Sequence, residues 1–348
     1  MNKKLLTLAV GAALATTSGI AAAEAEWSGT FNINLQETDV EGSNDTDALD
    51  VANGGSELVL RASEDTDNGM TGWIWLDLNV DNSDGANGTD SGLTFDNALV
   101  GLSGDFGTIA GGRAGSPHKG FVSSFDLFDN SPSDTAGNHT ITGGAGTKFS
   151  GIIEPVGTGV GYSNTWGEVS FAIGVQTDNG DQTQDTDNSA SLVWNSGAFS
   201  LGVSTYNRDD NGAVADSVEA NAESIVAVGG TWNLDNGIGL KVLFQQADDL
   251  ADTTVAGSSG ADSETLGLAA TFPVGPGTFG IQWYDTDYNA TAVASAGVGN
   301  IDDTTSYAIG YGIGLSDNVS VGATWGTIDS DTNADDSDGW DLGLTVSF

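Results

Sequence analysis

The chain has 348 residues and a formal charge of −41, with 49 acidic and 8 basic side chains, 51 glycines and no cysteine. This charge excludes nucleic-acid binding, which needs a basic surface. The lack of cysteine excludes disulfides, thiolate metal sites and cysteine nucleophiles. The 9 Trp, 13 Phe and 6 Tyr supply enough apolar surface for a folded protein rather than a disordered acidic tail.

The chain begins with the pattern of a secretory signal peptide. An early lysine pair precedes the apolar stretch LLTLAVGAALA, and small residues follow up to Ala23. We expect residues 1–23 to be removed, and cleavage after Ala25 fits the same rule. Loss of the two lysines moves the formal charge from −41 to about −43. The apolar stretch is too short for a membrane anchor, so residues 24–348 are expected to leave the cytoplasm as one domain.

From Trp27 onward the sequence alternates with a period of two, which is typical of half-buried strands and not of helices. The segment WSGTFNINLQ places Trp27, Phe31 and Ile33 on one face and small or polar residues on the other. The last segment, WDLGLTVSF, has an apolar face that runs from Trp340 to Phe348. Similar segments recur between them, which predicts an all-β fold.

The polar face distinguishes a membrane barrel from a water-soluble sandwich. It consists mostly of Gly, Ser, Ala, Thr, Asn and Gln, which are too small and polar for a core and lack the charge of a typical solvent face. Such residues suit the wall of a water-filled tube whose apolar face meets lipid. Because backbone groups in lipid find no water, only a closed barrel satisfies every strand edge.

Short and long links alternate along the chain, which predicts a transmembrane antiparallel up-and-down β-barrel of about sixteen strands. The short links include residues 164–167, 195–197, 233–237, 272–277 and 315–318. The long polar links lie at about 38–55, 81–94, 114–156, 177–188, 207–221, 247–263, 285–304 and 328–338.

Two segments resemble the general-diffusion porins of Gram-negative outer membranes. They are SELVLRASEDTDNGMTGWIWLDLNV at 56–80 and FDNALVGLSGDFGTIAGGR at 95–113, and the terminal Phe348 matches the last-residue aromatic of that family. The resemblance implies that Phe348 is read by the outer-membrane assembly machinery. It also implies that three barrels associate and that the third long loop, here about 114–156, folds into the barrel as a pore constriction.

The resemblance further indicates which side chains surround that constriction. Arg61 alternates against Leu60 and should point inward, and the aromatic side chains of the third loop should pack it against the wall. Lys241 should also face the lumen, since a cation facing lipid costs roughly 2–4 kcal/mol. The expected constriction residues are Glu57, Arg61, Asp96, Arg113, Lys119, Asp126, Asp129 and Lys148.

The sequence departs from the family at two of these positions. Glu57 and Asp96 stand where relatives usually carry arginine. This exchange replaces wall cations with carboxylates and predicts a mixed or net acidic ring, as in pores that favour cations.

Most of the remaining acid lies in the long links, as in DSDTNADDSD. Closely spaced Asp and Asn oxygens suit Ca²⁺ and other divalent cations, whereas a solvated surface adapted to high salt has the same composition. No twelve-residue EF-hand loop is present, and both interpretations stay open.

Motifs of enzymes are missing from the sequence. It contains no GxSxG, HExxH, P-loop or CxxC, and the two histidines, His118 and His139, are interpreted as incidental residues of the third loop. We therefore expect no enzymatic activity, no catalytic residue and no cofactor.

The sequence thus predicts a passive channel for small hydrophilic solutes and ions in the outer membrane, favouring cations. We expect a homotrimer that contacts outer-membrane lipid and the barrel assembly machinery and does not bind nucleic acid. The alternatives are a solute-specific porin, which needs an organised ladder of aromatic or cationic side chains, and a non-conducting structural or adhesin barrel.

Overall fold

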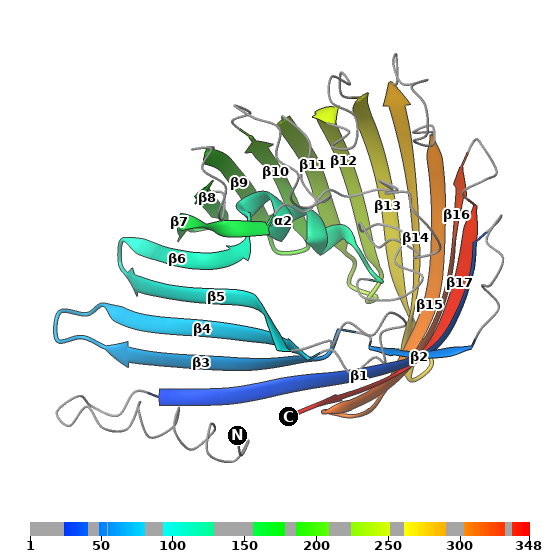
Figure 1. Ribbon diagram of the computed structural model, residues 1–348, viewed down its shortest axis with the longest axis horizontal. Helices are drawn as coiled ribbons and strands as arrows, with labels where there is room; N and C mark the ends of the chain where they lie inside the picture. Colours follow the sequence, from blue (N-terminus) through cyan, green and yellow to red (C-terminus); the bar gives the residue numbers. More distant parts are fainter. Residues whose placement is uncertain are drawn as a thin grey trace.

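The computed structural model (Figure 1) describes residues 24–40, 49–53, 55–80, 93–128, 156–177, 186–208, 224–250, 261–289, 303–330 and 336–348. The expected signal peptide and a part of each long link lie outside these residues. In the described part of the chain, no helix has the length and hydrophobicity needed to cross a bilayer.

The described elements are almost all strands. In chain order they are β1 (Glu24–Val40), β2 (Asp50–Asn53), β3 (Glu57–Asp65), β4 (Thr71–Val80), β5 (Leu93–Gly104), β6 (Gly107–Gly115), α2 (Pro117–Val122), the 3₁₀ helix η1 (Ser123–Phe125), β7 (Val156–Trp166), β8 (Val169–Thr177), β9 (Thr186–Ser196), β10 (Phe199–Asn207), β11 (Ser224–Asn233), β12 (Gly239–Leu250), β13 (Ala261–Val274), β14 (Gly277–Asn289), β15 (Thr304–Ser316), β16 (Val319–Ser330) and β17 (Ser337–Ser347).

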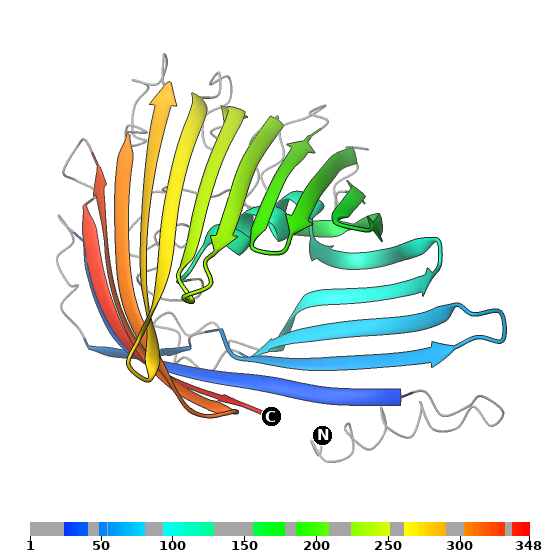
Figure 2. The same cartoon turned by 180° about the vertical axis from the view of Figure 1, so that it is seen from behind.

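These strands form one closed antiparallel sheet. Each strand from β3 to β17 pairs with the next, and β1 pairs with both β17 and β3. Because β2 and β3 follow each other along the same edge of β1, the 17 strands occupy sixteen positions around a closed barrel. Figures 1 and 2 show the curved wall from opposite sides, with α2 enclosed by it. The predicted barrel of about sixteen strands is confirmed.

The short strand β2 was not predicted, since the sequence assigned residues 38–55 to a loop. β1 is 17 residues long, and its pairing with β3 ends at Thr30, so its outer half needs another partner. β2 supplies that partner opposite residues 33–36. Gly55, with φ +80°, interrupts the edge between β2 and β3. There the hydroxyl of Ser56 accepts a hydrogen bond from Asn32 N–H (2.9 Å) and donates one to Asn32 C=O (3.1 Å), which replaces the missing strand pairing.

The alternation of faces follows the prediction. On β11 and β12, Val226, Val228 and Phe244 are exposed on the outer surface, whereas the intervening Ala227 and Leu243 are buried beneath the enclosed segment. The apolar outer face continues around the barrel, and lipid is the medium in which such a surface is stable.

Several short links are tighter than the sequence suggested. β7 continues to Trp166 and β9 to Ser196, so each of these turns consists of only two residues. Gly167 and Gly197 open the two turns with φ of +61° and +59°. A positive φ at the first turn residue matches the right-handed twist of the strands, and pairing can therefore continue up to the turn.

Aromatic side chains pair at the end of the barrel that carries the short turns. Phe199 stacks on Trp232 with ring centroids 5.0 Å apart, and Trp166 lies 4.7 Å from Phe171. Girdles of aromatic residues flank the apolar band of a membrane barrel where the bilayer meets water. Their position therefore indicates one membrane boundary.

The chain end closes the barrel. Phe348 N–H donates to Gly29 C=O (3.0 Å), and Gly29 N–H donates to Phe348 C=O (3.1 Å). The Phe348 ring is stacked with Phe31, at 6.1 Å between centroids, and covers Gly29, where a Cβ would lie only 2.6 Å from Cζ of the ring. The last residue is thus a part of the seam between β1 and β17.

We predict that Phe348→Ala slows barrel closure, because it removes an aromatic contact of about 0.5–1.5 kcal/mol at the seam. The measurement is the rate of folding into lipid vesicles, followed by the gel mobility of unheated samples. Phe199→Ala, which removes an equally stacked ring away from the seam, is the control. Equal folding rates for the two variants would show that Phe348 has no special role in closure.

Candidate functional site

A short helical segment lies inside the barrel. The segment, residues 116–128, contains α2 and η1 and follows directly after β6, and we call it the inner segment. Ser116 caps α2 by accepting the Lys119 N–H (3.0 Å), and Pro117 occupies the first helical position. α2 packs mainly on β9 and β10, and η1 on β12. The predicted inward course of the third loop therefore holds for its described part.

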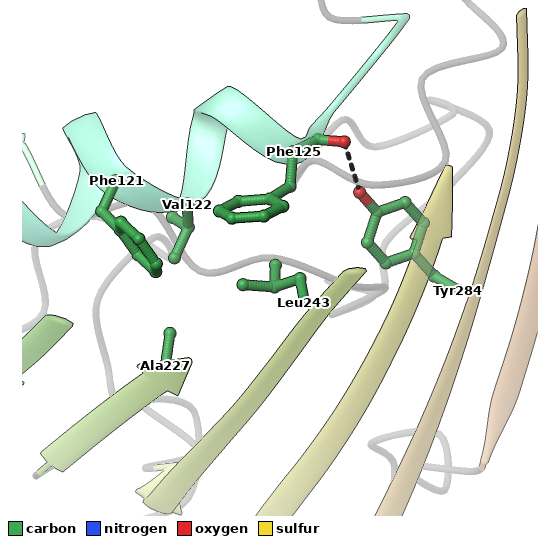
Figure 3. Close-up of a cluster of buried hydrophobic side chains, with 6 residues drawn as sticks. All are labelled: Phe121, Val122, Phe125, Ala227, Leu243 and Tyr284. Carbon is green, nitrogen blue, oxygen red and sulfur yellow. Dashed lines mark hydrogen bonds between the residues drawn. The ribbon is translucent and has the colours of Figure 1, made fainter. Parts of the chain in front are cut away.

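Apolar side chains attach the inner segment to the wall (Figure 3). Phe121, Val122 and Phe125 point from the helical turns toward the wall. There they meet Ala227 on β11, Leu243 on β12 and Tyr284 on β14. The rings of Phe121 and Phe125 meet edge to face at 5.2 Å. Their burial is the packing that the sequence predicted for the aromatic residues of this loop.

Glycines of the wall make room for these rings. A Cβ on Gly202 would lie 2.5 Å from the Phe121 ring, and a Cβ on Gly229 would overlap the Phe125 ring. Gly310 accommodates Phe128 in the same way, with a Cβ placed 2.5 Å from that ring. We call Gly202, Gly229 and Gly310 the ring seats. The sequence interpretation of inner-face glycines as wall of an open tube is therefore incomplete, since these glycines are covered.

Polar contacts fix the segment at both of its ends. At the start, His118 is fully buried; its N–H donates to Ser189 Oγ (2.9 Å), and its Nδ1 lies 2.9 Å from Ser204 Oγ. The interpretation of His118 as incidental is wrong, because both serines project from the wall at positions that hold the helix.

Further along the segment, three wall side chains bind its backbone. Lys241 Nζ donates to Ser124 C=O (2.6 Å), Tyr284 Oη donates to Phe125 C=O (3.1 Å), and Gln282 Oε1 accepts Leu127 N–H (2.9 Å). Lys241 faces the lumen, as its alternation predicts, and is engaged by the inner segment. Backbone groups of a buried loop need such partners.

The wall across the lumen from η1 carries carboxylates. Around the closed sheet, β3 and β4 lie opposite β11 and β12. Glu57 on β3 is within electrostatic range of Asp77 on β4 and of Asp96 on β5, and Arg61 acts on both Glu57 and Asp77. We call Glu57, Asp77 and Asp96 the acidic wall group. Its three carboxylates act on one another electrostatically, and one guanidinium acts on two of them.

A bulge explains how Asp96 joins this group. Asp77 pairs with Asn97, but the next residue, Leu78, pairs with Phe95, so Asp96 is the extra residue on β5. Asn97 Nδ2 donates to Asp77 Oδ2 (3.4 Å), which places Asn97 on the lumen face. Bulges re-aim side chains at functional positions of barrels, and this one adds a carboxylate to the wall.

The other expected site residues are distributed unevenly. Lys119 and Asp126 lie on the inner segment; Asp126 Oδ1 accepts the Phe128 N–H (2.8 Å) and acts electrostatically on Lys241. Arg113 is exposed and follows Gly112, whose φ of +138° interrupts the alternation of β6. Asp129 and Lys148 lie outside the described residues.

Sequence reasoning missed Asp77 as a member of the acidic wall group. Its signal was present, since Asp77 alternates against Leu76 and Leu78 in WIWLDLNV and shares a face with Trp75. It is 5% exposed, so it is covered rather than lining open water.

Comparison with known proteins agrees with the barrel architecture. A family model described as Gram-negative porin matches residues 9–333. A search of the curated proteins finds no match.

Solved structures share the fold at low sequence identity. An anion-selective porin from Comamonas acidovorans is 19% identical with a TM-score of 0.70, over 94% of this chain and 100% of that one. OmpT of Vibrio cholerae without loop L8 is 14% identical with a TM-score of 0.67, over 94% and 100%. A mutant of Rh. blastica porin is 14% identical with a TM-score of 0.60, over 93% and 100%.

We predict that Gly229→Leu lifts the inner segment off the wall, because overpacking against the Phe125 ring costs about 1–3 kcal/mol. Since the chain has no natural cysteine, Val122→Cys serves as the reporter. It is fully buried in the native structure and should resist a water-soluble maleimide, and Gly229→Leu should speed its reaction about tenfold or more.

Two variants control this measurement. Gly322→Leu adds the same side chain at a wall glycine whose Cβ would have no neighbour closer than 3.6 Å, and it should leave the reporter protected. Phe125→Ala combined with Gly229→Leu should restore protection. Fast labelling in the Gly322 variant, or none in the Gly229 variant, would contradict the role of the ring seat.

Proposed function

The chain belongs to the Gram-negative porin family of outer-membrane diffusion channels, and we propose that it passes small hydrophilic solutes and ions with a preference for cations. The family and the fold indicate a channel rather than an enzyme. The acidic wall group carries the proposal for selectivity, because fixed carboxylates across the lumen from the inner segment attract cations where the lumen is narrowed.

The balance of charge at this level supports the preference. Three carboxylates of the wall group face one guanidinium, that of Arg61. Lys241, on the opposite side, donates to Ser124 C=O and lies beside Asp126, so its charge is partly offset. Lys119 and the exposed Arg113 oppose the acid, and the preference we propose is therefore moderate.

The anion-selective porin from Comamonas acidovorans does not argue against this proposal. At 19% identity the two chains share the fold, whereas selectivity depends on individual wall residues. The carboxylates Glu57 and Asp96 are such residues here, and they provide the local difference that a cation preference needs.

The overall charge of −41 adds a second, weaker contribution. Acidic loops at a channel mouth raise the local concentration of cations, and this attraction decreases as the Debye length falls from about 10 Å at 0.1 M salt to about 3 Å at 1 M. Carboxylates inside the lumen are screened less. We therefore propose selectivity that weakens in concentrated salt without vanishing.

We also propose the assembly in which this channel works. It comprises a homotrimer in outer-membrane lipid, exported with a cleaved signal peptide and inserted by the barrel assembly machinery through Phe348. OmpT from Vibrio cholerae, which is 13% identical to this chain with a TM-score of 0.64, has been solved in a trimer form. That structure supports the proposal of a homotrimer. The long links are proposed to face the exterior, opposite the short turns.

The acidic loops are proposed to be a surface adapted to high salt. Among the described residues, no three His, Asp or Glu side chains converge to hold a metal ion. The loop segments with the densest acid lie outside those residues. A divalent site in these segments is the alternative proposal, and a dependence of thermal stability on a chelator would test it.

We predict that reversal potentials across a KCl gradient in planar bilayers show cation selectivity. Glu57→Arg combined with Asp96→Arg should shift the potential toward anions, because it exchanges two wall carboxylates for guanidiniums. Arg61→Ala should shift it toward cations. Large ohmic steps are expected throughout, whereas their absence would favour a structural or adhesin barrel.

The matched control is Asp235→Arg combined with Asp317→Arg. These exposed residues lie in short turns, so the formal charge changes by the same amount away from the lumen wall. An anion-selective native channel, or equal shifts for the two double variants, would remove Glu57 and Asp96 from the selectivity mechanism.

A further inference from the structure

Below the acidic wall group, toward the short turns, the lumen wall contains a hollow. It has a volume of about 650 Å³, and the lining residues Glu26, Arg61, Trp73 and Trp75 share the lumen face. This volume lies within the 300–1,000 Å³ usual for small-molecule sites. We call the hollow that these four side chains line the indole hollow.

The register of three neighbouring strands brings the four side chains together. Glu26 on β1 is directly opposite Arg61 on β3, and Arg61 is directly opposite Trp75 on β4. Trp73 lies two residues before Trp75 on β4, opposite Ser63, and therefore shares the lumen face. Directly opposed residues are close enough for their side chains to act on one ligand.

Contacts hold both indoles in defined positions. Trp73 Nε1 donates to Ser103 Oγ (2.9 Å), and the Trp73 ring lies over Gly101, where a Cβ would overlap it. Arg61 Cζ lies 5.2 Å from the centre of the Trp75 ring. An aromatic surface that is fixed before binding loses little entropy when a ligand packs on it.

The chemistry of the indole hollow favours a neutral ligand with hydroxyl groups. Glu26 and Arg61 carry opposite charges on adjacent strands, so an inorganic ion attracted by one is repelled by the other. A hydroxyl group both donates and accepts hydrogen bonds, and it can therefore satisfy the carboxylate and the guanidinium together. The indole faces need an apolar surface to pack on, which the C–H faces of a sugar ring provide.

We propose that the indole hollow is a binding subsite for neutral sugars on the diffusion path. The proposal rests on the proposed channel function and adds a solute class to it. It also supplies, on one side of the lumen, the aromatic and charged side chains that a solute-specific route requires. Trp73 offers the ring platform, and Arg61 and Glu26 bind the hydroxyl groups.

Current fluctuations in planar bilayers test the proposal, with glucose as the probe and mannitol as a linear polyol that has hydroxyl groups and no ring. Glucose should block the native channel at lower concentration than mannitol. Trp73→Ala should raise the half-blocking concentration of glucose about 2- to 12-fold, the range expected for loss of one aromatic contact. Trp73→Phe, which keeps a ring, should retain most of the block, and Trp325→Ala, which removes an outer-face indole, should leave it unchanged.

Saturation-transfer NMR on the detergent-solubilised native protein separates the two proposals. Transfer to glucose protons that disappears in Trp73→Ala and persists in Trp325→Ala supports the sugar subsite, whether or not the protein conducts. Conduction with no difference between glucose and mannitol, or with equal block in native protein and Trp73→Ala, would overturn the subsite and leave the channel function intact. Absence of ohmic steps would overturn the channel function alone.

Discussion

The structure depends on one constraint, the need to satisfy backbone hydrogen bonds where no water is present. A sheet whose apolar face meets lipid cannot leave an edge unpaired, so β1 has to bind β17 on one side and β2 and β3 on the other. The length of β1, the Ser56 bridge to Asn32 and the mutual hydrogen bonds of Gly29 and Phe348 are all consequences of that closure. Because the wall is complete without a packed core, its interior is available for other uses.

The inner face divides these uses between two sides. On β10, β11 and β15 the residues are small where rings of the inner segment need space, as at Gly202, Gly229 and Gly310. On β3 to β5 the inner face instead carries carboxylates, Arg61 and two indoles. An aromatic ring packed on a glycine is held by shape, and a charged wall acts through its field. One sheet thus positions the obstruction and forms the surface that solutes pass.

The sequence predicted most of the barrel, because alternation reports the face of each residue directly. It placed the apolar face outside, Lys241 inside, and the third loop in the lumen with Phe121 and Phe125 against the wall. It did not predict β2, since four residues, DVAN, are too few for a periodic pattern. It also missed His118 and Asp77 as site residues, because alternation identifies the face of a residue but not the partner that approaches from across the lumen.

The two charged features of the lumen are consistent with each other because they lie at different heights on the same strands. Along β4, Asp77 precedes Trp75 and Trp73 in the direction of the short turns, so a solute moving from the long-loop end meets carboxylates first and indoles second. In the selectivity that we propose, an inorganic cation gains at the acidic wall group and finds balanced charge below it. At the proposed subsite a neutral sugar gains little from the field, which acts on net charge, and gains from the indoles. The proposed ion selectivity and the proposed sugar affinity therefore depend on different side chains with one exception. That exception is Arg61, which touches Trp75 and acts on Glu57 and Asp77, and which couples the two.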